Sequence, residues 1–152
     1  MIEIERKFVV SQGKWKPSSQ GIKIIQGYLS VNLVSTIRIR IAGEKAFLTI
    51  KGKTVGIKRT ELEYEIPEKE GYILLKMCQG GLVEKTRYKE KIGNLIWEVD
   101  VFEGLNKGLV IAEVELSDEN EKVEIPEWVE KEVSDDKRFF NSYLSSKPFS
   151  TW

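Results

Sequence analysis

The 152-residue sequence contains no histidine and one cysteine, Cys78. Without histidine it lacks the commonest general base and zinc ligand, and it cannot form a Ser-His-Asp or Cys-His site. One cysteine excludes an internal disulfide and a cysteine cluster for zinc or iron–sulfur, and it fits a reducing compartment. Any chemistry must therefore use carboxylates, Lys, Arg, Tyr or Ser, and a bound metal should be oxygen-loving Mg²⁺, Mn²⁺ or Ca²⁺.

Long apolar runs are also missing. No run approaches the roughly 20 residues that span a membrane, and the chain is charged from Glu3 onward, unlike a secretory leader. Lys plus Arg total 24 and Asp plus Glu total 24, so no basic excess indicates nucleic-acid binding. We expect a cytoplasmic protein with neither membrane nor nucleic-acid partners, folded as a single domain over residues 1–152.

Most of the chain alternates with a period of two, which is typical of β-strands. We expect eight strands, at residues 2–8, 22–31, 35–42, 46–53, 57–66, 82–92, 95–103 and 109–117. Helical spacing predicts helices at 68–79, ending at Gly80 and Gly81, and at 135–146. Residues 118–133 should cross irregularly with a short strand. The predicted fold is α+β and mainly β, a closed eight-stranded antiparallel β-barrel, or tunnel, with a few flanking helices.

Charges on the predicted strands are sorted by sign. Four strands carry carboxylates, namely Glu3 and Glu5, Glu61 to Glu65, Glu98 and Asp100, and Glu113 and Glu115. Three strands carry cations, namely Arg38 and Arg40, Lys51 and Lys53, and Lys85 to Lys91. A solvated sheet usually mixes signs, because like charges on neighbouring positions repel. We therefore expect these faces to point into the barrel, where a polyanion binds the cations and a divalent metal binds the carboxylates.

The apolar faces would then form the outside of the barrel. The predicted helices and the segment with Trp128 are the material that covers this surface, and any uncovered part is a candidate homodimer interface. The alternative is an ordinary sheet whose charges face water, in which case the chain would bind no polyanion.

Taken in chain order, the motifs resemble those of the CYTH superfamily, or triphosphate tunnel metalloenzymes. The matching residues are Glu3, Glu5 and Lys7; Arg38 and Arg40; Thr49 and Lys51; Glu61 and Glu63; Lys85 and Arg87; Glu98 and Asp100; and Glu113 and Glu115. The stretch 132–141 also looks like the family's C-terminal helix. This resemblance covers essentially the whole chain, and implies a tunnel that binds a triphosphate with one or two Mg²⁺ or Mn²⁺ ions.

The resemblance implies a role for each charged position. The expected triphosphate ligands are Lys7, Arg38, Arg40, Lys51, Lys53, Lys85 and Arg87, among which the arginine forks suit phosphate oxygens best. The expected metal ligands are Glu3, Glu5, Asp100, Glu113 and Glu115, with Glu61 and Glu63 binding the metal directly or through another ligand. Tyr28 and Lys85 match a catalytic pair in some related triphosphatases, in which the ammonium lowers the pKa of the phenol. A metal-bound water that needs no protein base is the alternative.

The expected function is metal-dependent hydrolysis of a triphosphate, with inorganic tripolyphosphate converted to pyrophosphate and phosphate. Two alternatives are a class IV-type adenylyl cyclase, which converts ATP to cyclic AMP and pyrophosphate, and a non-catalytic polyphosphate- or nucleotide-binding module. Cyclases of the family tend to carry a His-Phe pair before the Glu-x-Glu-x-Lys signature. This sequence has no histidine, and its signature begins at Glu3.

Overall fold

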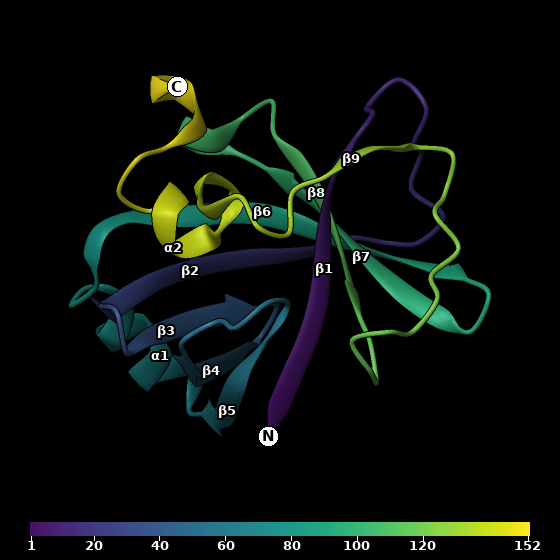
Figure 1. Cartoon of the computed structure of the whole chain (residues 1–152). Coiled ribbons are helices and arrows are strands. Elements are labelled where there is room, and N and C mark those ends of the chain that lie inside the picture. Colours follow the sequence, from purple (N-terminus) through teal and green to yellow (C-terminus); the bar gives the residue numbers. More distant parts are fainter.

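The computed structural model describes residues 1–152 and shows nine strands in one antiparallel sheet (Figure 1). They are β1 (Ile2–Val10), β2 (Ile22–Val31), β3 (Ser35–Ala42), β4 (Lys45–Gly52), β5 (Lys58–Ile66), β6 (Gln79–Ile92), β7 (Leu95–Phe102), β8 (Val110–Glu115) and β9 (Val129–Glu132). The order is β5-β4-β3-β2-β6-β7-β8-β1-β9, and β1 also pairs with β5. Eight strands therefore close into the predicted barrel, and β9 is an extra strand beside β1.

The first strand, β1, closes the barrel by changing partners along its length. Its first residues pair with β5, where Glu3 lies opposite Arg59. From Glu5 onward it pairs with β8, so that Glu5 lies opposite Glu115 and Lys7 opposite Glu113. Because side chains alternate between the two faces of a strand, Glu3, Glu5 and Lys7 project into the barrel between β5 and β8.

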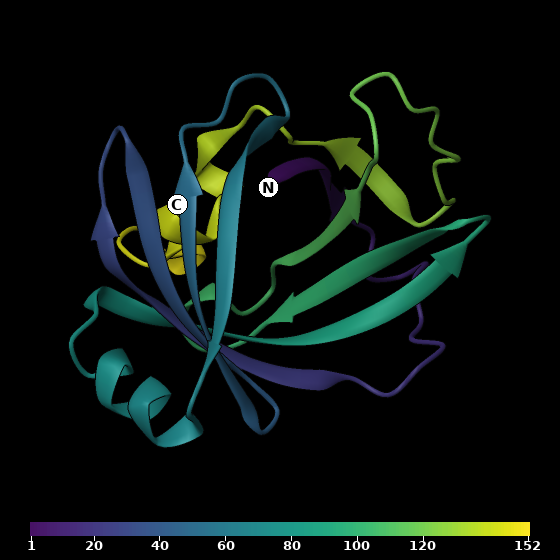
Figure 2. The same ribbon diagram turned by 90° about the horizontal axis from the view of Figure 1, so that it is seen from below.

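A single regular helix, α1 (Glu68–Leu75), packs on the outside of β3 and β4 (Figure 2). Gly71 permits this close packing, because an added Cβ would lie 2.5 Å from Cβ of Ala46. The helix ends earlier than the sequence pattern predicts. Residues 76–78 form i to i−3 hydrogen bonds that tighten the last turn, and Gly80 and Gly81 belong to β6 instead of ending the helix.

The predicted C-terminal helix at 135–146 is wrong in its extent. The chain forms a 3₁₀ turn at Lys137–Phe139 and a short helix α2 (Asn141–Leu144), and Phe140 between them is extended, with ψ 137°. Two more 3₁₀ turns occur at Gly104–Asn106 and Phe149–Thr151. Buried Phe139 and Leu144 pack with Val83 and Phe102, which fixes this segment against β6 and β7.

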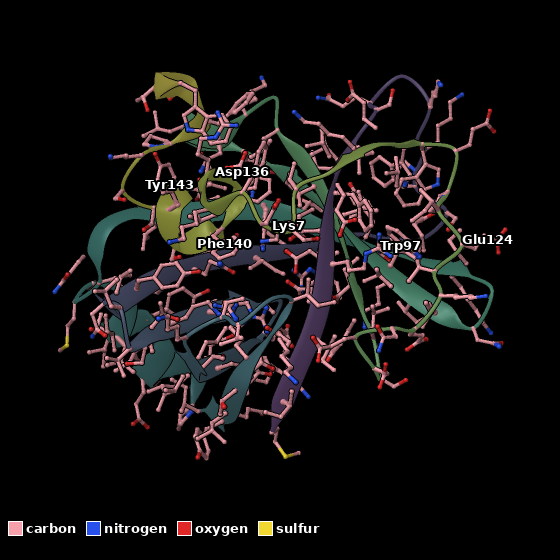
Figure 3. All side chains as sticks on the ribbon, viewed as in Figure 1. Lys7, Trp97, Glu124, Asp136, Phe140 and Tyr143 are labelled. Carbon is pink, nitrogen blue, oxygen red and sulfur yellow. The ribbon has the colours of Figure 1, made fainter.

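The apolar core lies outside the barrel wall, as the alternation predicts. Trp97 is fully buried, with its ring centroid 5.1 Å from that of Phe8 and 5.7 Å from that of Trp128. Figure 3 shows Trp97 on one side of β1, and Lys7 and Phe140 on the other. A separate cluster lies beneath α1. Hydrophobic packing and the charged interior are thus separated by one layer of backbone.

Two further observations concern partners. The outer face of β5 is left uncovered, with Leu62 and Tyr64 exposed by 38% and 52%, and the homodimer interface stays a prediction for this surface. No helix has the length and apolar character needed to cross a membrane.

Candidate functional site

The barrel encloses a cavity of about 200 Å³ whose lining is almost entirely charged or polar. Nineteen residues line it, and two of them, Tyr28 and Phe140, are aromatic. The cationic members are Lys7, Arg38, Arg40, Lys51, Arg59, Lys85 and Arg87, and the acidic members are Glu3, Glu5, Glu61, Glu63, Glu98, Glu113 and Glu115. The charged faces therefore point inward, which contradicts the alternative of a solvated sheet.

Two of the predicted site residues do not line the cavity. Lys53 follows the end of β4 at Gly52 and is exposed to solvent, because the inward alternation stops with the strand. Asp100 is fully buried behind the wall and receives hydrogen bonds of 2.7 and 2.9 Å from Arg87. Burial alone would raise the pKa of Asp100, but the charges of Arg87 and Lys85 outweigh it and lower that pKa. Asp100 therefore acts here as a counter-ion to lumen cations.

The arginines of β3 form the centre of the cationic wall. Burial lowers the pKa of Arg40 to about 10, and the charges of Arg38 and Arg87 add to this effect. Glu63 lies 3.6 Å from Arg38 and 3.2 Å from Arg40, so one carboxylate forms ion pairs with two guanidinium groups. The Nε atoms of both arginines are buried without a hydrogen-bond partner. Buried N–H groups are nearly always paired, so these two donors are left unsatisfied in this structure.

Lys85 is the most enclosed cation. Its side chain is 2% exposed, and its Nζ lies 2.7 Å from Oδ2 of Asp100 and 3.0 Å from Oδ1 of Asn141. Burial lowers the pKa of Lys85 to about 8, although the charge of Asp100 opposes this shift. Lys85 therefore stays mainly charged at neutral pH, inside a fixed network.

The acidic wall is richest in charge around Glu5, Glu113 and Glu115, which lie on the paired strands β1 and β8. Burial raises the pKa of Glu5 well above its usual value, and the charge of Glu113 raises it further. Burial would also raise the pKa of Glu113, but the charge of Lys7 and a hydrogen bond with Glu5 hold it well below the usual range. The two shifts run in opposite directions, so Glu5 keeps its proton to higher pH than Glu113 does.

These three carboxylates fit a hard divalent cation by their chemistry, because oxygen ligands and surplus negative charge favour Mg²⁺ or Mn²⁺. No three acidic side chains converge as a finished ligand set in this structure. Glu3, in particular, lies 3.1 Å from Lys51 and 3.3 Å from Arg59, so those cations already compensate it.

Tyr28 and Lys85 both line the cavity, but no hydrogen bond joins them. Tyr28 is 5% exposed and lies opposite Arg38 in the β2–β3 register. Its hydroxyl accepts a 3.4 Å hydrogen bond from Nε2 of Gln26, whereas Lys85 engages Asp100 and Asn141. The predicted pair therefore shares a cavity without direct contact.

Six lining residues were missing from the predicted site, namely Thr36, Arg59, Glu98, Phe140, Asn141 and Ser142. The first three share the inward parity of their strands, so the alternation itself could have identified them. The last three reach the cavity because the C-terminal segment folds back over the barrel. No local pattern in the sequence indicates that contact.

Fold and lumen together define a β-barrel with a charged tunnel, and comparison with known proteins agrees. Residues 1–142 match the CYTH domain family, and the chain therefore belongs to that family. An inorganic triphosphatase of Acetivibrio thermocellus is 42% identical over 151 residues, covering 99% of this chain and 97% of the relative. One from Nitrosomonas europaea is 36% identical over 151 residues, covering 95% and 97%. The crystal structure of the inorganic triphosphatase NE1496 aligns with a TM-score of 0.68 and 32% identity, covering 94% of this chain and 93% of that one.

Proposed function

We propose that this protein is a metal-dependent triphosphatase that hydrolyses inorganic tripolyphosphate to pyrophosphate and phosphate inside the barrel. The observation that carries the proposal is a cavity lined by seven cations, among them Arg38 and Arg40, whose Nε donors have no partner within the protein. A polyanion supplies acceptors for these cations, and charged hydrogen bonds of this kind are strong. The inorganic triphosphatase names of the two sequence relatives support the same substrate.

The cationic residues would bind the phosphoryl oxygens. We assign this role to Lys7, Arg38, Arg40, Lys51, Lys85 and Arg87, and add Arg59 because it lines the same wall. Lys53 has no part in the proposal, since it lies outside the cavity. Phosphoryl transfer depends on positioning and on neutralising charge on non-bridging oxygens, and these side chains come from five different strands. They would therefore surround a triphosphate instead of touching one side of it.

A divalent cation, Mg²⁺ or Mn²⁺, would be held by Glu5, Glu113 and Glu115. When bound, such an ion neutralises phosphate oxygens and acidifies a coordinated water. Glu3, Glu61, Glu63 and Asp100 have cation partners at 2.7–3.2 Å in this structure, closer than the 3.8 Å between Lys7 and Glu113. They would have to leave those close partners to bind a metal. We therefore assign these four to holding the lumen cations in place.

Tyr28 is the proposed proton acceptor for the attacking water. It is buried at the cavity wall opposite Arg38. Lys85 would remain an ammonium group that binds the phosphate being transferred. The single, unpaired Cys78 is consistent with a cytoplasmic location for this reaction.

The test is phosphate release from tripolyphosphate, ATP and thiamine triphosphate, each with Mg²⁺, Mn²⁺ or a chelator. We expect the fastest release from tripolyphosphate and none with chelator. Formation of cyclic AMP and pyrophosphate from ATP would instead identify a cyclase. Tight binding of tripolyphosphate without release under any metal condition would identify a binding module and contradict the proposal.

A further inference from the structure

The C-terminal segment places a neutral polar side chain, Asn141, in the wall of the cavity. Asn141 begins α2, which is anchored by the buried side chain of Leu144 and by a 2.8 Å hydrogen bond from the amide of Gly81 to the carbonyl of Ser145. Functional groups on anchored elements keep their geometry. Asn141 thus reaches the site from outside the barrel strands, on an anchored segment.

The carbonyl oxygen of Asn141 holds Lys85. Lys85 donates to Oδ1 of Asn141 at 3.0 Å, and its Nζ lies 2.7 Å from Oδ2 of Asp100. A lysine ammonium has three N–H donors, so two of them are occupied and the direction of the third is fixed. Lys85 is 1% exposed, which leaves little room for any other arrangement. Asn141 and Asp100 together therefore orient the ammonium group of Lys85.

The amide nitrogen of Asn141 has no such partner. It donates no hydrogen bond within the chain, although the side chain lines the cavity. The orientation of the amide is set by Lys85, because an ammonium only donates and must meet the oxygen end. Two N–H donors are consequently left for an acceptor that the protein does not supply.

We propose that Asn141 contacts the substrate, with its carbonyl oxygen positioning Lys85 and its amide N–H groups donating to a phosphoryl oxygen. This inference rests on the proposed triphosphatase function. A neutral amide suits both tasks, because it accepts from the ammonium without cancelling its charge and also donates to an anion. An aspartate in this position would perform the first task only, and an alanine neither.

The experiment measures calorimetric binding of tripolyphosphate in the presence of a chelator, so that hydrolysis does not intervene. Asn141→Ala should weaken binding about 10- to 100-fold, the scale of hydrogen bonds to a charged group. Asn141→Asp should weaken it further, because it removes the donors and adds a negative charge facing the anion. Ser146→Ala, an exposed change in the same segment, is the matched control and should bind like wild type. Thermal unfolding of each variant checks that it is folded.

The outcomes separate the two claims. If Asn141→Asp binds as tightly as wild type, the amide does not donate to the substrate and the inference fails. Unchanged binding by Asn141→Ala would remove Asn141 from the site, while wild-type hydrolysis would leave the proposed function standing. A wild-type protein that neither binds nor hydrolyses tripolyphosphate would overturn both. Steady-state rates with metal provide a second readout, in which kcat/KM should fall in parallel with affinity.

Discussion

Lys85 on β6 and Asp100 on β7 form the most deeply buried ion pair of the protein, with 2.7 Å between Nζ and Oδ2 and side chains that are 2% and 0% exposed. The same carboxylate also accepts two hydrogen bonds from Arg87. One buried anion therefore compensates the buried Lys85 and the partly buried Arg87, and both cations line the cavity.

This arrangement predicts that Asp100→Asn destabilises the protein by about 3 kcal/mol, because it leaves the buried ammonium of Lys85 without its ion-pair partner. Arg87 keeps Glu98 at 3.4 Å. Urea unfolding in chelator measures the change. Asp136→Asn is the matched control, since Asp136 forms an ion pair with Arg138 at the surface and should unfold almost like wild type. Equal stabilities for wild type and Asp100→Asn would show that water reaches Lys85 and Arg87.

The carboxylate pair Glu5 and Glu113 predicts a specific dependence of stability on pH. The pKa of Glu5 is raised in the folded protein, so the folded state holds a proton that the unfolded state releases once the pH exceeds the ordinary glutamate range. The contribution of Glu5 is therefore most favourable at low pH and falls as the pH rises toward the folded pKa. Glu5→Gln has no carboxyl group to ionise, so it should not lose this stability. We expect its free energy of unfolding at pH 7, measured in chelator, to exceed that of wild type.

Denaturation at pH 5 and pH 7 tests this expectation. The gain in unfolding free energy from Glu5→Gln should be larger at pH 7 than at pH 5. A gain that shrinks with rising pH would contradict the assignment of the retained proton to Glu5. Glu119→Gln, at a surface ion pair with Lys58, provides the control.

Metal binding should release protons. The pKa of Glu5 is raised, so Mg²⁺ or Mn²⁺ binding at Glu5, Glu113 and Glu115 should displace protons that Glu5 holds. Calorimetry in two buffers of different ionisation enthalpy measures this release. We expect more protons to be released per ion by wild type than by Glu5→Gln, which should also bind the ion more weakly. Binding without proton release would place the metal elsewhere.

Arg38→Ala should weaken tripolyphosphate binding by about 1.5–3 kcal/mol, the scale of hydrogen bonds to charged groups. Its unpartnered Nε is one of the donors that this change removes. Arg138→Ala, on the exposed C-terminal segment, serves as a control of equal charge change. An unaltered isotherm for Arg38→Ala would place Arg38 outside the binding site.

Tyr28→Phe should reduce kcat far more than it raises KM, because it removes a proton acceptor and leaves the cationic wall intact. Steady-state kinetics on tripolyphosphate measure both constants, and Tyr143→Phe in the C-terminal segment provides the control. If turnover is unchanged, a metal-coordinated water needs no help from this phenol, and the base is not Tyr28.

The sequence predicts the barrel and most of its lumen because both depend on strand alternation. Once Arg38 and Arg40 occupy one face of β3, their inward direction follows from the isoleucines on the other face. Two side chains expected in the cavity lie elsewhere, because the alternation ends before the residue or does not decide whether the residue is covered. Lys53 keeps the parity of β4, but the strand stops at Gly52. Asp100 keeps the inward parity of β7, yet Arg87 and Lys85 cover it completely.

The C-terminal contribution could not be predicted in the same way. Periodicity over 135–146 favours a docked helix, but Phe140 is extended and interrupts it. That interruption brings the Phe140 ring to 5.1 Å from Nζ of Lys7 and brings Asn141 to Lys85. These contacts join positions more than 50 residues apart in sequence, and they depend on tertiary packing instead of local preference.

The location of the apolar clusters outside the wall has a consequence for how such a protein can change. Trp97 and the residues beneath α1 hold the barrel together without touching the lumen. Inward-facing side chains can thus be exchanged for others of similar size with no repacking of the shell that surrounds them. A tunnel of this construction can acquire a new ligand preference through a few lumen substitutions, while its hydrophobic packing is provided by a separate set of residues.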